Sequence, residues 1–225
     1  MPSFAEAYPT LVELAPRTLA LGGDSPFMAA AAIILGRTLK AVTVRSILAG
    51  WADRGLDDLV AFSEADDEEI EEILRVAGIK PFAKLRAVLK RLAAWLLDKQ
   101  SVDEDWLASA RSAESVREEL AAIAGIGPNT ADAIALHALG LATYPVDRAS
   151  YRILVRHGWI DESADYEEAR STLMRTDDPA ELIRLSITLD RIGREFCRAG
   201  RPNCVPCPLS RFLPEGGPCG SEGEE

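Results

Sequence analysis

Apolar residues recur along most of the chain at the i, i+3, i+4 spacing of an amphipathic helix, and this periodicity constrains the fold more than any other feature. Glycine and proline residues punctuate the periodic segments. The pattern predicts helices over residues 27–39, 43–52, 56–62, 67–77, 81–97, 113–123, 129–139, 149–157, 166–175 and 179–196. Alternating patterns typical of strands are nearly absent, so the sequence predicts an all-α fold of about ten short helices.

The chain is acidic overall, but its charge is unevenly distributed. It carries 25 Lys+Arg against 36 Asp+Glu, a formal net charge of −11, which argues against non-specific adhesion to nucleic acid or anionic membranes. Acidic residues concentrate in the segment 63–72, where they suit the first turn of a helix. Segments 80–91 and 191–213 are basic. A local basic face therefore remains compatible with the net charge, because charges are screened beyond roughly 8–10 Å at physiological salt.

The N-terminal segment lacks the marks of a targeting or membrane sequence. It has neither a basic n-region nor a continuous apolar h-region. The most apolar stretch, 27–35, is far shorter than the about 20 residues that a transmembrane helix needs. With a globular composition of 48% hydrophobic residues, these features lead us to expect a soluble, cytoplasmic protein of one or two domains.

Four cysteines gather near the end of the sequence with the spacing Cys-x6-Cys-x2-Cys-x11-Cys. They are Cys197, Cys204, Cys207 and Cys219. Disulfides are one interpretation, but an intracellular chain keeps its thiols reduced, which favours a metal site. The spacing alone leaves zinc and an iron–sulfur cluster open. The proline-rich loops between the cysteines have little core of their own, so the metal would hold this segment together.

The segment 120–131 predicts a tight hairpin between two helices. Gly125 and Gly127 let the backbone approach a ligand closely, and Pro128 suits the first position of the second helix. Backbone N–H groups at such a helix N-terminus can bind a phosphodiester without Lys or Arg, which suits an acidic protein. A plain αα-hairpin would accept the same Gly-Ile-Gly turn and is the alternative interpretation.

Asp147 lies fifteen residues or so beyond the hairpin, directly before a predicted helix. A helix N-cap is a common use of aspartate in this position. The functional interpretation is a carboxylate close to the hairpin, able to stabilise a cationic transition state or to activate water.

Together and in this order, these segments resemble the endonuclease III branch of the helix-hairpin-helix DNA glycosylases. The resemblance covers nearly the whole chain and is highly specific as an ordered set. Its elements are Pro26-Phe27 before an apolar helix, Ile123-x-Gly-Ile-Gly-x-x-Thr-Ala131, Val146-Asp147-x4-Arg152 and Gly193-Arg194-x2-Cys197-x6-Cys204-x2-Cys207.

The resemblance implies two helical domains, a helical barrel over 24–140 that ends in the hairpin and a discontinuous cluster domain formed by 1–23 and 141–225. The four cysteines would hold a structural 4Fe–4S cluster. Asp147 would be catalytic and face a pocket for a nucleotide flipped out of the duplex. The protein would bind double-stranded DNA as a monomer. Further expected DNA contacts are Gly125, Gly127, Thr130, Arg198 and Arg201.

The chain departs from the family pattern at the hairpin, where Asn129 occupies the position of the lysine found in bifunctional members. That lysine forms a Schiff base with the sugar, which an amide cannot do. Asp147 and Asn129 are thus the predicted catalytic positions of a monofunctional glycosylase that removes oxidised or deaminated pyrimidines. The alternatives are a bifunctional enzyme with weak AP-lyase activity and a non-catalytic DNA-binding protein of the same fold. A zinc-bound helical adaptor with no DNA role is a more distant one.

Two further departures concern the residues that fill the gap left by a flipped base, and the last cysteine. The family commonly has Gln where this chain has the short Thr38, so Leu39 or Arg37 is an alternative wedge. Ile79 matches an apolar wedge in a second loop, with a buried core position as the other interpretation. The eleven residues before Cys219 replace a usual gap of five, which weakens its assignment as the fourth ligand.

Overall fold

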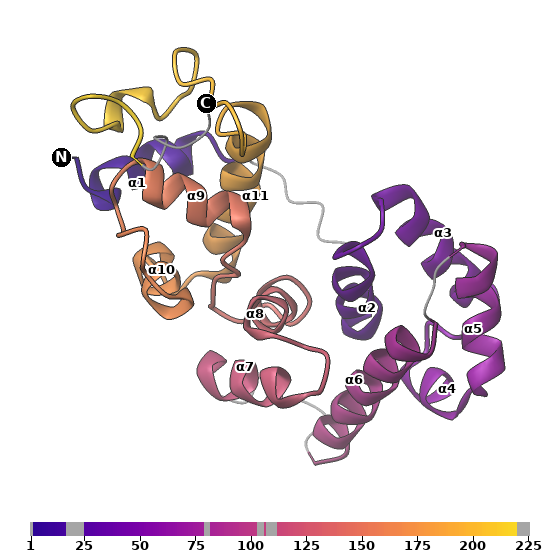
Figure 1. The fold of residues 1–225 in the computed structure, drawn as a ribbon. Coiled ribbons are helices and arrows are strands. Elements are labelled where there is room, and N and C mark those ends of the chain that lie inside the picture. The colour runs from indigo at the N-terminus through magenta and orange to yellow at the C-terminus, as the bar shows by residue number, and fades with distance from the viewer. Residues whose placement is uncertain (1, 17–24, 79–81, 103–105, 107–111, 220–225) are drawn as a thin grey trace. The chain divides into compact units, whose positions relative to one another are not determined.

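The computed structural model describes residues 2–16, 25–78, 82–102, 106 and 112–219. Within them, the chain forms eleven α-helices and one short 3-10 helix and contains no β-strand (Figure 1). The all-α prediction is confirmed. The helices divide into two compact units, one formed by residues 21–141 and the other by residues 1–20 together with 142–225. No helix in the described part is long and apolar enough to cross a membrane.

The unit of residues 21–141 is built around a closely packed aromatic centre. The Phe62 ring lies 4.6 Å from the Phe27 ring and 5.3 Å from the Trp51 ring, centroid to centroid, and all three side chains are buried. Its helices are α2 (Pro26–Gly36), α3 (Ala41–Ala52), α4 (Leu59–Glu64), α5 (Asp67–Val76), α6 (Phe82–Val102), α7 (Ala113–Ala122) and α8 (Pro128–His137). Helix α8 packs against both α7 and α2, so the α7–α8 turn is fixed to the body of this unit.

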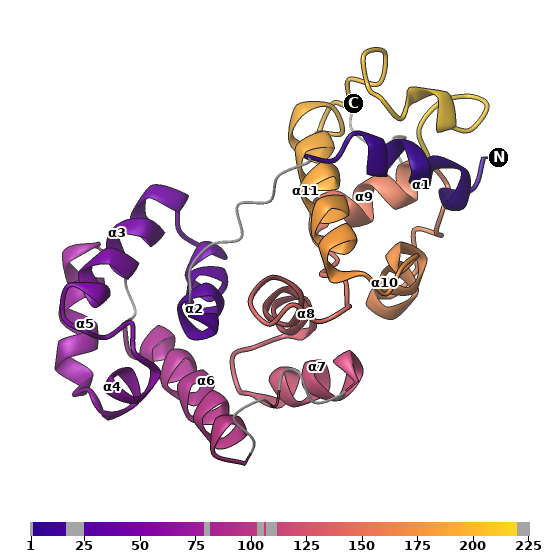
Figure 2. The ribbon, with the colours of Figure 1, turned by 180° about the vertical axis from the view of Figure 1, so that it is seen from behind.

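The unit formed by the two ends of the chain is built on helix α11. Helices α1 and α9 both pack against α11, and Figure 2 shows the three helices side by side. Its elements are α1 (Phe4–Glu13), α9 (Arg148–Arg156), α10 (Tyr166–Leu173), α11 (Pro179–Glu195) and the 3-10 helix η1 (Ser210–Phe212). Helices α9 and α11 approach so closely that a Cβ on Gly193 would lie 2.5 Å from the Cβ of Ala149. The N-terminal helix is anchored where the Trp159 Nε1–H donates to the Pro2 carbonyl at 3.0 Å.

The ten helices predicted from periodicity are all present, with shifted ends. Helix α4 begins at Leu59 rather than at residue 56, because the Asp58 side chain caps it by accepting from the Ala61 N–H at 2.9 Å. Helix α6 continues to residue 102, beyond the apolar pattern, where Lys99 forms an ion pair with Glu119 of α7. A local side-chain cap at α4 and an ion pair between α6 and α7, neither of which periodicity reveals, thus accompany the shifted helix ends.

Candidate functional site

The hairpin turn between α7 and α8 requires glycine at its first position. Gly125 has a φ of +102°, a region that favours glycine. A Cβ added there would lie 2.3 Å from the Cγ2 atom of Val88 on α6. The packing of α6 against the turn therefore excludes a side chain at Gly125, independently of any ligand.

Gly127, the second glycine of the turn, has no such internal reason to be glycine. It is the N-cap of α8, with φ −92° and ψ 171°, a conformation that any residue adopts. No atom lies within 4 Å of a Cβ built on it. Helix α8 also lacks a side-chain hydrogen bond at its N-cap. The turn thus presents a bare backbone at a helix N-terminus, where N–H groups and the helix dipole favour an anion.

A buried ion pair locks the two helices of the hairpin together. Arg117 of α7 donates through Nε to Oδ1 of Asp132 on α8 at 2.9 Å, and the two residues are 8% and 0% exposed. Arg117 Nη1 also donates to the exposed Glu114 at 2.6 Å. Loss of a buried partner of such a pair costs up to about 3–5 kcal/mol. This pair was not predicted. The only sequence signal for it is a carboxylate on a largely apolar helix.

The residues predicted to contact DNA from the hairpin differ in exposure. The Thr130 side chain is only 4% exposed, so any contact to a ligand would come from its backbone. Asn129 is half-buried in the first turn of α8. Thr38 is exposed in the turn that follows α2. Ile79, the predicted apolar wedge, lies outside the described residues.

Asp147 is the N-cap of α9, as the structural interpretation of its position predicts. Its Oδ1 atom accepts the Ser150 N–H at 2.7 Å, which fixes the side-chain rotamer. The residue is nevertheless exposed, and Oδ2 has no hydrogen-bond partner among the described residues. Burial, and secondarily the charge of Asp147, raise the pKa of Asp190 on α11, despite the opposing effect of Arg194. The N-cap hydrogen bond thus fixes the orientation of the Asp147 carboxylate and leaves it exposed to solvent.

Three of the four cysteines line a single pocket at the end of α11. All four thiols are free, and Cys197 and Cys207 are buried. The pocket is lined by Arg156, His157, Phe196, Cys197, Asn203, Cys204, Cys207, Ser210, Leu213 and Pro218. Cys219 is tied to its edge, because its backbone N–H donates to the Arg156 carbonyl at 2.9 Å. The described residues nevertheless contain no group of three side chains already arranged to hold a metal ion.

Burial of the thiols and the guanidinium of Arg156 act in opposite directions on the charge at this pocket. Burial raises the pKa of the Cys204 and Cys207 thiols, with neighbouring thiols adding to the effect. The buried Arg156 guanidinium donates to the Arg198 and Ala199 carbonyls at 2.6 and 2.8 Å and lies 3.5 Å from the Cys197 Sγ atom. No carboxylate pairs with it in the described part of the chain.

A neighbouring histidine, His157, also lines the pocket. The His157 Nδ1 atom lies 2.8 Å from the Ile153 carbonyl, whereas Nε2 is buried with no hydrogen-bond partner among the described residues. Soft thiol donors and a guanidinium that has no carboxylate partner among the described residues together fit a thiolate-bound metal group.

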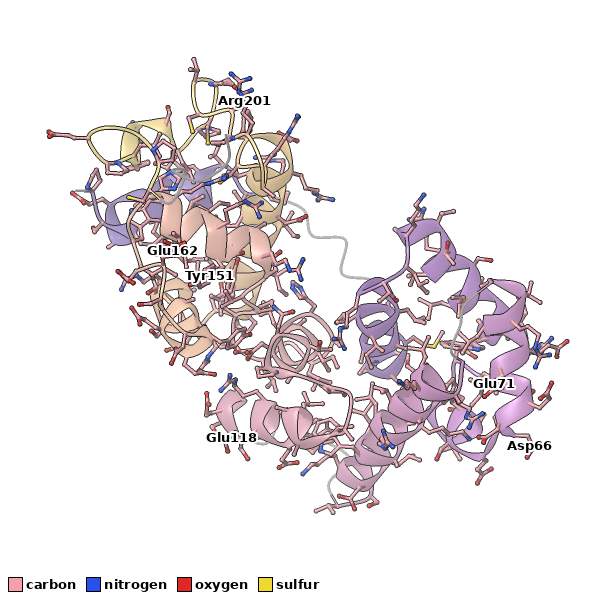
Figure 3. All side chains as sticks on the ribbon, viewed as in Figure 1. Asp66, Glu71, Glu118, Tyr151, Glu162 and Arg201 are labelled. Atoms are coloured by element: carbon pink, nitrogen blue, oxygen red, sulfur yellow. The ribbon has the colours of Figure 1, made fainter. Side chains whose placement is uncertain are left out.

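Arg152 of the aspartate motif connects α9 to the cysteine segment. Its Nε atom donates to the Cys197 carbonyl at 2.8 Å, and Nη1 donates to the Arg148 carbonyl at 3.2 Å. Arg198 and Arg201, the expected phosphate contacts, are exposed, and Figure 3 shows Arg201 at the tip of the loop that carries the cysteines.

Several curated proteins resemble the chain in sequence, although no family model matches it. Endonuclease III of Sulfolobus acidocaldarius is 28% identical over 149 residues, 66% of this chain and 63% of that protein. Endonuclease III of Bacillus subtilis is 33% identical over 106 residues, 44% of this chain and 46% of that protein. The DNA glycosylase/AP lyase ROS1 of Arabidopsis thaliana is 26% identical over 171 residues, 68% of this chain but 12% of that protein. The chain therefore spans less than two thirds of the length of these relatives.

Solved structures share the fold over nearly the whole chain. An endonuclease III in a trapped covalent intermediate with DNA has a TM-score of 0.70 at 23% identity and covers 96% of this chain and 98% of its own. A thermostable thymine-DNA glycosylase has a TM-score of 0.64 at 17% identity, with coverages of 91% and 92%. The chain is thus similar in sequence to proteins named endonuclease III and shares the fold of a solved endonuclease III.

Proposed function

We propose that this protein is a base-excision repair glycosylase that binds duplex DNA through the α7–α8 hairpin and removes a damaged pyrimidine. The observation that carries the proposal is Gly127, whose missing side chain neither its backbone conformation nor its packing requires. Close approach of a phosphodiester to the uncapped N-terminus of α8 supplies the missing reason. The DNA complex among the structural neighbours belongs to a protein of the same fold.

Asp147 is the group that we assign to the chemistry on the sugar. In this mechanism, the base is flipped out of the duplex, and the carboxylate stabilises the oxocarbenium-like sugar as the glycosidic bond breaks. The hydrogen bond from the Ser150 N–H to Oδ1 holds the carboxylate in one rotamer. Oδ2 then remains to orient the attacking water. The products are the free base and an abasic site.

We further propose that the enzyme is monofunctional, in contrast to the relative named as a glycosylase/AP lyase. Asn129 occupies the hairpin position at which bifunctional members carry their lysine. A carboxamide nitrogen is not a nucleophile toward the sugar C1′ and forms no Schiff base, so β-elimination of the 3′ phosphate has no route through this residue.

The cysteine pocket is proposed to hold a 4Fe–4S cluster bound by Cys197, Cys204 and Cys207, with Cys219 as the fourth ligand. The segment that follows α11 is rich in proline and poor in apolar residues. The cluster would therefore stabilise this segment by cross-linking it through the cysteines. Arg198 and Arg201 on this loop are then placed to contact DNA phosphates. A purified protein with iron and an absorbance band near about 400 nm supports this assignment. Stoichiometric zinc without that band contradicts it.

The decisive experiment compares the wild type with Asp147→Asn on a panel of duplexes that carry thymine glycol, uracil or other damaged pyrimidines. Asparagine is as good an N-cap as aspartate, so this change removes the charge while it preserves the start of α9. We expect base excision to fall by about 10²–10⁴-fold with the melting temperature unchanged. Each reaction is analysed with and without alkali, which separates base removal from strand cleavage.

Two controls complete the assay. Asp178→Asn changes another aspartate N-cap, that of α11, and is expected to leave excision intact. Sodium borohydride is added to the wild-type reaction, and an efficient covalent protein–DNA adduct would contradict the monofunctional assignment. Tight duplex binding without excision of any lesion would instead favour a non-catalytic DNA-binding protein.

A further inference from the structure

Two arginines from different helices hold the hairpin turn by its carbonyl groups. Arg37, which directly follows α2, donates through Nη1 to the Gly125 carbonyl at 3.2 Å. Arg91 of α6 donates through Nη1 to the Ala124 carbonyl at 3.0 Å. These are consecutive carbonyls at the start of the turn, so both guanidinium groups lie at the same short stretch of backbone.

Neither of these guanidinium groups is neutralised by a carboxylate within the described residues, although the chain has a large excess of acid. Other arginines of the same unit are paired: Arg54 with Glu72, Arg75 with Glu68, and Arg86 with Asp67 and Glu71. Arg37 and Arg91 are also exposed. Their positive charge is therefore available to a ligand, whereas that of the paired arginines is largely cancelled.

The position of these charges changes what the hairpin offers to an anion. Carbonyl oxygens carry partial negative charge and repel a phosphate that approaches the turn. A guanidinium that is not paired with a carboxylate and donates one N–H to such a carbonyl masks this repulsion, while its remaining N–H groups stay available. Up to two positive charges are then added to the neutral N–H donors of α8.

We infer that Arg37 and Arg91 form a phosphodiester-binding pair that gives the hairpin of this acidic protein its cationic character. The inference rests on the proposed binding of DNA by the hairpin and adds two side chains to it. It also assigns Arg37 a function other than filling the gap left by a flipped base, since its guanidinium is bound to the hairpin backbone.

The test measures the affinity for a duplex with a tetrahydrofuran abasic site over a range of salt concentrations. Arg37→Gln and Arg91→Gln keep a polar side chain with an N–H donor, two bonds shorter than Nη1, but lose the positive charge. Each phosphate contact contributes about 0.9 to the slope of log affinity against log salt. We therefore expect each single variant to lose about one unit of slope, and the double variant about two.

Matched variants separate charge from structure. Arg45→Gln removes an exposed arginine of α3 that has no recorded ion pair, and is expected to leave the slope unchanged. Arg37→Ala and Arg91→Ala lose the hydrogen bond as well, and their melting temperatures are compared with those of the Gln variants. A purely structural role predicts that Gln restores both the melting temperature and the wild-type slope, and this result would overturn the inference.

The failure of the inference is distinguishable from the failure of the proposed function. If the wild type binds the duplex with a steep salt dependence and both Gln variants keep that slope, the arginine pair is not a phosphate contact. If the wild type shows no salt-dependent duplex binding at all, DNA binding by the hairpin is itself contradicted.

Discussion

The hairpin and the cysteine loop satisfy their polar groups in opposite ways. In the hairpin, the chain supplies its own partners: Asp132 neutralises Arg117, and arginine side chains bind the carbonyls of the turn. Around the cysteine pocket, Arg156 likewise binds carbonyls, but three thiols line the pocket and the His157 Nε2 atom has no hydrogen-bond partner among the described residues. The hairpin is therefore organised before it meets a ligand, whereas the cysteine pocket is the place where we propose that a bound cluster completes the structure.

The largest expected effect on stability tests whether the buried ion pair holds the hairpin together. Asp132→Ala removes the buried carboxylate of Arg117 and leaves it the exposed Glu114, so the free energy of unfolding is expected to fall by up to about 3–5 kcal/mol. Urea unfolding followed by circular dichroism measures this change. Glu72→Ala breaks an exposed ion pair with Arg54 and is expected to cost about 1 kcal/mol or less. Equal effects of the two substitutions would show that the buried pair does not hold the hairpin.

The cysteine loop is tested by removing its thiols. Cys207→Ala removes a buried thiol from the pocket, and we expect loss of the cluster, with its absorbance band and iron content, and a lower melting temperature. Cys219→Ala is expected to have the same effect on iron content if this residue is the fourth ligand despite its long spacing. Iron retained at the wild-type level in Cys219→Ala would exclude it from the ligand set.

The two glycines of the hairpin are expected to differ in their effect on stability when each is replaced by alanine. Gly125→Ala forces a side chain into a positive-φ conformation and against Val88, so it is expected to reduce stability by about 1–3 kcal/mol. Gly127→Ala meets no atom and reduces the freedom of the unfolded chain, but alanine is a poorer N-cap than glycine, so stability is expected to change by about 1 kcal/mol or less.

DNA binding is expected to rank these two variants differently from stability. Gly127→Ala is expected to weaken duplex binding about tenfold or more, because a methyl group would hold the phosphate away from charge-assisted N–H donors. Paired thermal melts and binding titrations measure both quantities. Unchanged affinity in Gly127→Ala would remove the main support for a phosphate site at the start of α8.

The smallest expected effect is a gain of Schiff-base formation at the hairpin. Asn129→Lys restores the nucleophile type of bifunctional relatives, so a borohydride-trapped protein–DNA adduct is expected where the wild type gives none. Denaturing gel electrophoresis of the trapped reaction measures it. Asn129→Gln lengthens the side chain without an amine and should give no adduct. Equal trapping by the wild type and Asn129→Lys would show that another amine acts as the nucleophile.

The sequence predicted the helices and the residue types of the site better than the contacts between them. The apolar period of α5 or α11 is a local property, and both helices appear where it predicts them. The cap role of Asp147 is equally local and is confirmed. The proposed catalytic role of Asp147 remains a prediction, because it depends on a DNA substrate.

What the sequence could not predict are contacts that depend on tertiary packing. Nothing in the Gly-Ile-Gly pattern distinguishes Gly125, which Val88 of another helix requires, from Gly127, which no neighbour requires. The bond from Arg37 to Gly125 joins residues 88 positions apart and has no local signature. The burial of Thr130 likewise follows from how α8 packs within its unit.

The open space beside Gly127 also bears on how such a protein can evolve. A population selected only for folding would retain Gly125 and let Gly127 drift to other good N-cap residues, because a side chain at Gly127 meets no atom in the folded chain. A population selected for repair of its genome would retain both. The ratio of tolerated substitutions at these two neighbouring positions therefore records whether a lineage still uses its hairpin on DNA, independently of which lesion it removes.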